Sequence, residues 1–421
     1  MQTRPRVAIV GGGVAGVASA IALAEKGYAV SLFDALPLLS GTSNNTPGRL
    51  GMGFHYATPN TAAMLFDTTI DLVTRYPHAT LGRQLPLGHP LRRAQYFVAR
   101  DSLFGTEEIA AVHDMLAERY ARAWQRSHRA LPFGEPGSFL RRLREEEYGA
   151  YTNPDEICMG VDTAEVLMDW PEIRSRLDAQ VRASPRIDVY EGHAVEALHH
   201  NRKFAWSVGA RGPDGRLHRF DAQMVINCAW QNIDTVNAMA GLPVQEGAVN
   251  RLKVLLRAKL PPRLRERSSM FFCMGPFAMF SNMNDGEGMM TYAPVTNIGA
   301  AQAGDEEALA KINRILCGGV DAAESQRLAD ALRHGVARFI PAMGEAVPVT
   351  LKFGVVRTRG ECDLWDKDSD VHHRDYAGVR VESDDFITNA ATKLIYFARN
   401  ADHVAARVGQ CMPLERAEYA A

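Results

Sequence analysis

A short apolar run that ends at three glycines constrains this chain more than any other feature. Residues 7–10, VAIV, predict a buried strand, and the small-residue stretch after the glycines predicts a helix. Gly11, Gly13 and Gly16 stand between them in G-x-G-x-x-G spacing. Such glycines provide a tight turn, close approach of the backbone to a pyrophosphate, and close packing of helix on strand. The pattern therefore predicts a dinucleotide site with its phosphates at the helix N-terminus.

The element that follows supports this prediction. A second apolar run, residues 30–33, closes on Asp34, where an acidic side chain can accept hydrogen bonds from ribose hydroxyl groups. A secretory signal peptide is the alternative for the same stretch, because Arg4 and Arg6 precede a long uncharged run. Early glycines are unfavourable in the helix of a signal peptide, and a signal peptide gives no reason for the second strand and its acid. We therefore expect a nucleotide-binding element.

Composition limits the class of protein. The chain has 421 residues, of which 46% are hydrophobic, and this is enough for two domains. Its formal net charge is −2, so no overall field attracts nucleic acid or an anionic membrane. The six cysteines are scattered without a C-x-x-C pair, which indicates free thiols in a reducing compartment and no metal site. No stretch approaches a membrane span, and we expect a cytoplasmic protein.

Three later regions differ in character. Residues 35–60 form a loop rich in Gly, Ser, Thr and Asn, and a loop that leaves the second strand of a dinucleotide fold runs along the cofactor. Residues 186–220 predict strands and a hairpin, which favour a layered α/β sheet with an added antiparallel meander. Residues 250–295 predict an antiparallel sheet with a hairpin turn at 284–286. This last block has no nucleotide signature, so it is the candidate substrate domain.

The whole chain resembles the FAD-dependent oxidoreductases of the D-amino-acid oxidase / glycine oxidase superfamily. The resemblance rests on four stretches in family order: VAIVGGGVAGVASAIALAEKGYAVSLFDA; GTSNNTPGRLGMGFHY; EGHAVEAL with AQMVINCAW; and GVVRTRG with FITNAATKLIYFARNADHVAARV. The second stretch looks like the flavin-wrapping loop of the branch that contains L-2-hydroxyglutarate and glycerol-3-phosphate dehydrogenases. The last resembles the family's arginine strand and the G-G-K-x-T turn before the final helix.

The resemblance implies an α/β fold in which a Rossmann-type FAD-binding domain accompanies a discontinuous antiparallel-sheet substrate domain. The implied FAD-binding domain comprises residues 1–75, 155–240 and 340–421, and the substrate domain comprises residues 76–154 and 241–339. FAD is then bound non-covalently and extended, with its isoalloxazine at the junction of the two domains. Substrate oxidation delivers a hydride to flavin N5. Covalent attachment through Cys317 or Cys362 is not expected, because neither sequence context matches.

The residues that correspond to the family's cofactor contacts lie in all four stretches. The resemblance implies that FAD is held by Gly11, Gly13, Val14, Ala15, Gly16, Asp34, Ala35, Thr42, Ser43, Asn44, Asn45, Arg49, Val195, Ala229, Trp230, Arg357, Ala391, Thr392, Lys393 and Leu394. Lys393 is expected near the pyrimidine edge of the flavin, where a positive charge stabilises the reduced ring.

Three motifs depart from the family pattern. The paired glycines before the lysine are Ala390 and Ala391, and Trp230 stands where a glycine is usual. The hydroxy-acid branch commonly has a histidine two residues before the last glycine of the wrapping loop, and that place is Gly51 here. The nearby histidine is His55. These departures weaken a direct transfer of hydroxyglutarate activity.

Four residues are the candidates for the chemistry. Arg357 is the first candidate for binding a substrate carboxylate, because a planar guanidinium binds carboxylates through two hydrogen bonds. The alternative for Arg357 is a structural ion pair with an acid such as residue 361 or 363. Arg49 contacts either the flavin or the substrate, or it holds the loop. His55 and Tyr56 are expected to line the flavin edge, where either could assist an amine nitrogen.

The expected function is FAD-dependent oxidation of a C–N bond in a small amine or amino acid, by an oxidase or a dehydrogenase. The missing loop histidine favours this over a 2-hydroxy-acid dehydrogenase. A flavin monooxygenase or biosynthetic tailoring enzyme is a further alternative, although no second G-x-G-x-x-G is present for a nicotinamide. A protein in which FAD is structural is the last. The expected partners are a small-molecule substrate and an electron acceptor, either O2 or another carrier, with no nucleic acid.

Overall fold

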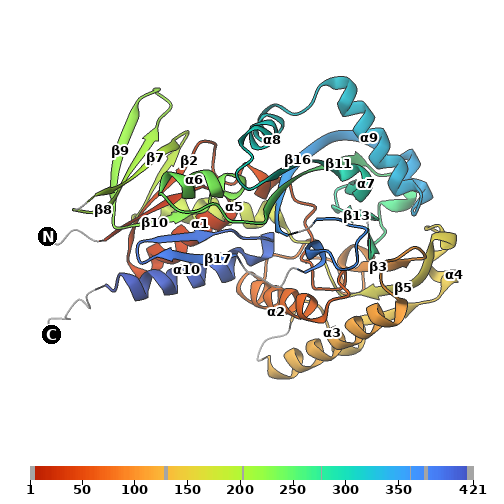
Figure 1. Cartoon of the computed structure of the whole chain (residues 1–421). Coiled ribbons are helices and arrows are strands. Elements are labelled where there is room, and N and C mark those ends of the chain that lie inside the picture. Colours follow the sequence, from red (N-terminus) through yellow and green to blue (C-terminus); the bar gives the residue numbers. More distant parts are fainter. Residues whose placement is uncertain are drawn as a thin grey trace. The chain divides into compact units, whose positions relative to one another are not determined.

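The computed structural model describes residues 5–127, 131–201, 203–275, 277–360, 362–373 and 378–414 (Figure 1). The chain forms two compact units. Unit 1 comprises residues 1–44, 174–246 and 376–421, and unit 2 comprises residues 45–173 and 247–375. None of the helices in the described ranges combines the length and the apolar composition that a membrane crossing needs.

Unit 1 is built on a six-stranded sheet in the order β17-β18-β10-β1-β2-β6, parallel except for the edge strand β17. Its strands are β1 (Arg6–Val10), β2 (Ala29–Asp34), β6 (Ile187–Glu191), β10 (Met224–Asn227), β17 (Val379–Ser383) and β18 (Phe386–Asn389). These strands are short and mostly buried, as expected of a parallel sheet with both faces covered.

Helices cover one face of this sheet and a meander covers the other (Figure 1). The helix α1 (Val14–Lys26) packs on α10 (Phe397–Cys411). The antiparallel strands β7 (Ala194–Asn201), β8 (Ala205–Arg211) and β9 (Leu217–Ala222) bring apolar side chains against Ala8, Val10 and Phe33. Two further helices are α5 (Trp170–Ala183), which crosses the unit boundary, and α6 (Ile233–Met239). Within these layers, the short turn between the end of β1 and the start of α1 carries the glycines.

Unit 2 is built on a nine-stranded, mostly antiparallel sheet in the order β15-β11-β14-β13-β12-β3-β5-β4, with β16 paired to β11. Its strands are β3 (Ala94–Ala99), β4 (Leu140–Leu143), β5 (Ile157–Thr163), β11 (Ala248–Lys259), β12 (Ser269–Cys273), β13 (Ala278–Asn282), β14 (Glu287–Tyr292), β15 (Asn297–Gln302) and β16 (Val347–Arg359). The helices are α2 (Pro59–Arg75), α3 (Thr106–Arg126), α4 (Glu145–Tyr148), α7 (Ala293–Thr296), α8 (Glu306–Gly318) and α9 (Ala322–Ala337).

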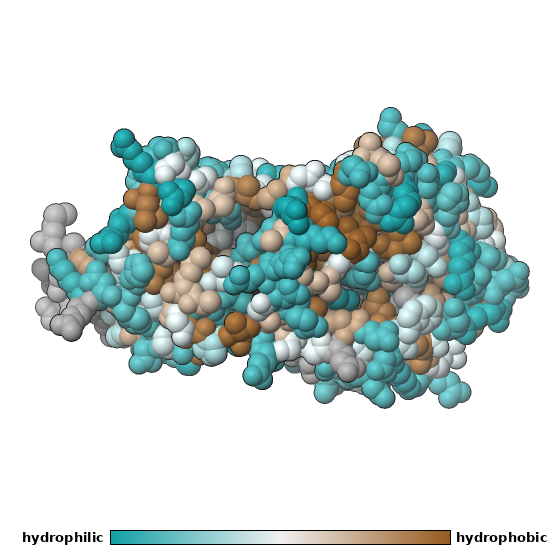
Figure 2. All heavy atoms as spheres, turned by 45° about the horizontal axis from the view of Figure 1, so that its top comes forward, coloured by the Kyte–Doolittle hydropathy of each residue, from teal (hydrophilic) through white to brown (hydrophobic). Residues whose placement is uncertain are grey.

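The two faces of this larger sheet have different coverings. One face carries Phe97, Phe272 and Phe280, which form a core with α9 side chains such as Leu332. Strand alternation places Tyr96, Phe271 and Met279 on the opposite face, where strand pairing sets them side by side across β3, β12 and β13. We call this second surface the loop face, because the residues of the 45–56 loop contact it. Figure 2 shows apolar side chains gathered where α8 and α9 come forward.

The elements expected from the sequence are present, but the unit boundaries differ from the expected domains. Residues 45–75, 155–173 and 340–375 were expected in the FAD-binding domain and lie in unit 2. The reason is strand pairing: β5 hydrogen-bonds to β3, and β16 hydrogen-bonds along the length of β11. The hairpin turn and the meander lie where the sequence predicts them.

Candidate functional site

The glycine turn of unit 1 joins β1 to α1 by very close backbone contacts. Gly11 has a φ of +107°, and a Cβ atom there would lie 2.5 Å from the carbonyl oxygen of Cys228. A Cβ atom on Gly16 would lie 1.8 Å from the carbonyl oxygen of Gly11. A side chain at Gly11 is excluded by conformation and by space, and a side chain at Gly16, inside the helix, is excluded by space alone. The close packing of helix on strand that the spacing predicts is confirmed.

The first turn of α1 presents backbone N–H groups that its own cap leaves uncovered. The N-cap residue is Gly13, which has no side chain to accept from them. The Oγ atom of Ser43 accepts a hydrogen bond from the N–H of Val14 over 3.1 Å, so the expected wrapping residue lies directly at this turn. A helix N-terminus of this kind binds anions through its free N–H groups and its dipole. These residues fit the diphosphate of FAD.

Asp34 braces the turn as well as ending β2. Its carboxylate accepts the N–H of Gly12 over 2.6 Å and the N–H of Leu36 over 2.7 Å. Burial raises the pKa of Asp34, and the two backbone hydrogen bonds oppose that rise. The side chain is half-buried. Its contact with ribose hydroxyl groups stays a prediction, as does the contact of Ala35, which is exposed beside it.

Other expected cofactor residues of unit 1 lie on a short helical turn after β2 and on β7. Thr42, Ser43 and Asn44 form a single helical turn, and the guanidinium of Arg174 donates to Asn44 over 3.1 Å. Val195 lies on β7, opposite Ala210. The contacts of these residues with FAD are untested predictions. Arg174 is a polar neighbour that the sequence reasoning missed, because no local motif distinguishes it.

The end of β10 lies beside the glycine turn. The N–H of Cys228 donates to the carbonyl of Val10 over 2.7 Å, and a Cβ atom on Gly11 would lie 2.9 Å from the backbone nitrogen of Ala229, which Trp230 follows in the chain. Trp230 has a φ of +51°, the left-handed region that favours glycine. The tryptophan therefore occupies a conformation that favours glycine, which is the residue that the family resemblance leads one to expect at this position.

The turn before α10 has alanines where the family resemblance leads one to expect glycines. Ala391 and Thr392 are buried, and Lys393 is half-exposed at the start of the helical turn Leu394–Tyr396. The amide of Asn389, at the end of β18, donates to Ser19 Oγ on α1 over 3.2 Å. This contact ties the turn to the helix that follows the glycines. The roles of Ala391, Thr392, Lys393 and Leu394 toward FAD stay predictions.

In unit 2, the 45–56 loop is fastened at many points. Asn45 donates its side-chain N–H to the carbonyl of Phe353 on β16 over 2.7 Å. Arg49 pairs with Leu167 as an isolated bridge, and the N–H of Met168 donates to the carbonyl of Gly48 over 2.6 Å. The loop thus runs as a ribbon beside residues 165–168. It is a structured element and not a loose surface loop.

The guanidinium of Arg49 lies on the loop face among aromatic and sulfur atoms. It lies 4.3 Å from the centre of the Phe271 ring, and its Nη2 donates to Tyr96 Oη over a long 3.3 Å. Its Nη1 contacts Met279 Sδ at 3.1 Å. Nε is buried and has no hydrogen-bond partner within the described ranges. An arginine has five N–H donors, so this one keeps donor capacity for an anionic ligand.

Electrostatics keep Arg49 charged. Burial lowers the pKa of Arg49, but the neighbouring Tyr96 and Glu165 outweigh this effect and raise it. Tyr56 adds to the rise, so it lies within electrostatic reach of Arg49. The rings of His55 and Tyr56 meet edge to face, with centres 5.7 Å apart. The loop therefore brings Arg49 and Tyr56 together, and His55 with Tyr56.

Arg357 has a different environment. Its side chain is only 3% exposed, and its Nη1 donates to Asn250 Oδ1 over 3.3 Å. Asn250 is its partner in the β11–β16 pair, and alternation along β11 puts Asn250 on the same face as Val254 and Leu256, which belong to the α9-covered core. Arg357 and Arg49 therefore do not share a face of the sheet. Of the proposed ion-pair partners, Glu361 lies outside the described residues, and Asp363 accepts the N–H of Trp365.

One polar residue of the loop face was missed from the sequence. Glu165 is completely buried and accepts three hydrogen bonds, from the N–H of Gly51 (2.9 Å), the N–H of Met52 (3.0 Å) and the hydroxyl of Tyr96 (2.7 Å). An acid two residues after a strand carries no motif of its own. The signal that could have drawn attention to it is an acidic residue inside the otherwise apolar segment 164–168.

The comparisons with known proteins agree with this geometry. Solved structures with similar folds include glycine oxidase from Geobacillus kaustophilus, at 16% identity and a TM-score of 0.63, covering 96% of this chain and 95% of that one. L-Proline dehydrogenase from P. horikoshii is 13% identical with a TM-score of 0.64, and the alignment covers 97% of this chain and 94% of that one. L-alpha-Glycerophosphate oxidase from Mycoplasma pneumoniae, with FAD bound, is 16% identical with a TM-score of 0.64, and the alignment covers 99% of this chain and 96% of that one. A comparison with curated protein sequences finds no match.

The family model described as DAO, FAD dependent oxidoreductase, matches residues 6–363, which is most of the chain. The match begins at β1 and includes the glycine turn, the 45–56 loop, the sheet of unit 2 and four of the six strands of the unit 1 sheet, and it ends before β17 and β18. The structure's glycine turn and uncapped helix N-terminus suit the diphosphate of that cofactor. The chain belongs to the DAO family of FAD-dependent oxidoreductases.

Proposed function

We propose that this enzyme oxidises a C–N bond of a small amine or amino acid that carries a carboxylate. The observation that supports the proposal most is Arg49: a half-buried cation, set against Phe271, whose Nε has no partner in the described part of the chain. A cation held in apolar surroundings without a direct anion is costly unless a ligand supplies the anion. Arg49 is therefore the residue we propose to bind the substrate carboxylate.

The chain's residues have separate tasks in this proposal. FAD supplies the acceptor for a hydride that leaves the carbon beside the nitrogen. Arg49 fixes the carboxylate, so that the C–H bond has one orientation. The nitrogen must lose a proton for an imine to form, and His55 or Tyr56 is positioned on the same loop to hold that proton. Water then hydrolyses the imine.

Two relatives with similar folds support a C–N substrate, since one is named a glycine oxidase and the other an L-proline dehydrogenase. The second candidate is a 2-hydroxy-acid dehydrogenase; the name of the glycerophosphate oxidase favours oxidation of a C–O bond, although glycerophosphate is not a hydroxy acid. Against it, the place of that branch's loop histidine is Gly51, whose N–H bonds to Glu165. All six cysteines are free thiols, which supports our placing the enzyme in the cytoplasm.

Anaerobic reduction of the bound flavin tests the proposal. The purified protein is mixed without oxygen with panels of amino acids, N-methyl amines and 2-hydroxy acids, and the loss of flavin absorbance is followed. We expect bleaching by members of the first two panels only. Bleaching by 2-hydroxy acids alone would establish the second candidate, and bleaching by NADPH alone would indicate a monooxygenase. Reoxidation by air or only by a dye then distinguishes an oxidase from a dehydrogenase.

A further inference from the structure

The buried carboxylate of Glu165 has an arrangement that simple structural support does not require. Burying a charge is strongly unfavourable unless hydrogen bonds or an opposite charge compensate it. Glu165 obtains two of its three hydrogen bonds from the backbone of the 45–56 loop, at Gly51 and Met52, and the third from Tyr96. Its partners are therefore the loop and the residue that touches Arg49.

Tyr96 stands between the two charges. Its hydroxyl donates to Glu165 and accepts from Nη2 of Arg49. Burial and the charge of Glu165 raise the pKa of Tyr96 well above its ordinary value, so the phenol stays neutral and keeps its proton for the carboxylate. Glu165 lies one hydroxyl group away from Arg49, so it offsets part of the guanidinium charge without a direct ion pair. The N–H groups of Arg49 then stay available to a ligand.

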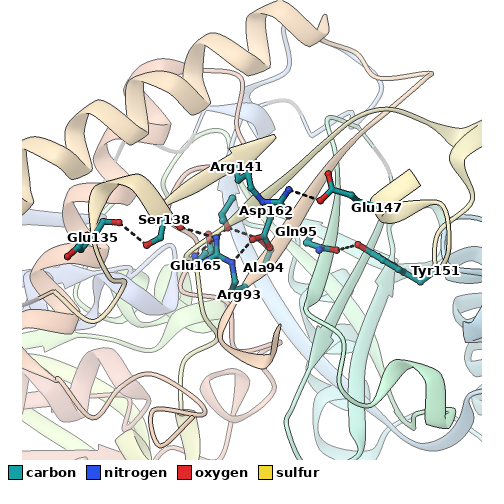
Figure 3. A network of polar contacts seen from close by, with 11 residues as sticks. Arg93, Ala94, Gln95, Glu135, Ser138, Arg141, Glu147, Tyr151, Asp162 and Glu165 are labelled. Atoms are coloured by element: carbon teal, nitrogen blue, oxygen red, sulfur yellow. Dashed lines mark hydrogen bonds and ion pairs between the residues drawn. The ribbon is translucent and has the colours of Figure 1, made fainter. Parts of the chain in front are cut away.

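A nearby acid shows the contrasting, structural arrangement. Asp162, also on the β5 side of the sheet, pairs directly with Nε of Arg93 over 2.5 Å, and Arg93 also donates to the carbonyl of Ser138 (Figure 3). Figure 3 also shows the neighbouring pair in which Arg141 donates to Glu147. Asp162 is nearly as buried as Glu165, but its charged and hydrogen-bonding partners are Arg93, Arg141 and Gln95, which lie outside the 45–56 loop. It is therefore a matched control for the loss of a buried carboxylate.

We propose that Glu165 is a positioning residue. It holds residues 51 and 52 of the loop by their backbone N–H groups, and through Tyr96 it fixes the guanidinium of Arg49 in the orientation that receives an anionic ligand. The second half of this inference rests on the proposed function, because it takes Arg49 as the anion receptor. The first half concerns only the loop and stands apart from the identity of the substrate.

Amide hydrogen exchange of the FAD-loaded protein tests the first half. In Glu165→Gln, one carboxylate oxygen becomes an NH2 group that cannot accept from Met52 or Tyr96. We expect peptides covering residues 48–56 to exchange about tenfold faster or more, beyond any change in global stability. Asp162→Asn, corrected in the same way, should leave those peptides at the wild-type rate. Equal exchange in Glu165→Gln and the wild type, or an equal effect of Asp162→Asn, would overturn this half.

The variant Tyr96→Phe distinguishes the effect on ligand binding from the effect on the loop. It removes the bridge to Arg49 but leaves Glu165 bonded to Gly51 and Met52, so exchange of the loop should stay at the wild-type rate. Anthranilate is a suitable probe because it carries a nitrogen and a carboxylate. Calorimetric titration should show that Tyr96→Phe binds anthranilate about tenfold more weakly than the wild type does, while the affinity for the uncharged anthranilamide is unaffected. Unchanged anthranilate affinity would overturn the second half. If anthranilate fails to bind the wild type, the role of Arg49 in the proposed function is contradicted, and the exchange result still decides the role of Glu165.

Discussion

The glycine turn of unit 1 and the loop face of unit 2 are built from different materials. At the turn, the backbone makes the site: Gly11 and Gly16 exclude any side chain, and the N-cap Gly13 has no side chain to accept from the first N–H groups of α1. On the loop face, side chains from β3, β12 and β13 and from the end of β5 surround Arg49. A backbone site is suited to a diphosphate that all relatives share, whereas a side-chain site can change its ligand by substitution.

The largest effect should come from a change at the turn. Gly16→Ala places a methyl group 1.8 Å from a backbone carbonyl, which cannot move without separating α1 from β1. We expect the purified variant to carry no flavin. Gly41→Ala is the matched control, because no atom lies within 4 Å of its added Cβ. Flavin content after denaturation checks both, and full flavin in Gly16→Ala would break the claim that the backbone makes this site.

The next effect should come from the loop face. Arg49→Met removes the proposed carboxylate receptor and should raise the half-saturating concentration of a carboxylate substrate by roughly 100-fold, while the flavin content is kept. Arg357→Met should change that concentration little and lower thermal stability instead, because Arg357 is buried against Asn250. Steady-state or flavin-reduction kinetics checks the pair. The reverse ranking would show that Arg357, and not Arg49, binds the carboxylate.

A buried histidine makes unit 2 sensitive to acid. His113 is completely buried; its Nε2 lies 2.9 Å from the carbonyl of Phe54, and its Nδ1 has no partner in the described ranges. Burial lowers the pKa of His113 to about 4. Because the unfolded chain binds the proton near pH 6.5, stability should be complete above that pH and fall as the pH drops toward 4.

The size of this acid effect is measurable. Between pH 8 and pH 5, His113 should account for about 2 kcal/mol of lost stability. His113→Gln should flatten that part of the curve of unfolding free energy against pH, measured by urea denaturation. An unchanged slope between pH 8 and pH 5 would show that His113 titrates normally in the folded protein.

The smallest effect concerns the strained tryptophan beside the turn. Replacing Trp230 by either glycine or alanine removes the same indole, but only glycine relieves a φ of +51°. Trp230→Gly should therefore be more stable than Trp230→Ala by about 1 kcal/mol. Thermal melts of the two variants check this difference. Equal melting temperatures would mean that the backbone at this position is not constrained by conformation.

The same contrast explains how much the sequence could predict. The turn was predictable because its requirements are local: the Gly11-Gly13-Gly16 spacing, the flanking strands and Asp34 all lie within residues 7–34. The fold class and most elements followed from apolar periodicity and turn residues. The domain boundaries were less accurate, because which sheet β5 and β16 join depends on strand pairing between distant segments.

The loop face could not be predicted in the same way. Glu165 and Tyr96 lie far from Arg49 in the sequence, and only the strand register brings them together. Arg357 was a reasonable candidate from its motif, but alternation along the strand places it on the other face of the sheet. Register is set by cooperative pairing, and a shift by one residue reverses every side chain. No local pattern reveals it.

Flavin content shows whether this chain binds FAD, on which the proposed function depends. The protein is purified without added cofactor, denatured, and the released chromophore is identified and quantified against the chain. We expect a yellow protein that releases FAD in an amount close to equimolar with the chain. Any colourless fraction should take up added FAD. A colourless chain that cannot be reconstituted with FAD would contradict the claim that this chain binds FAD.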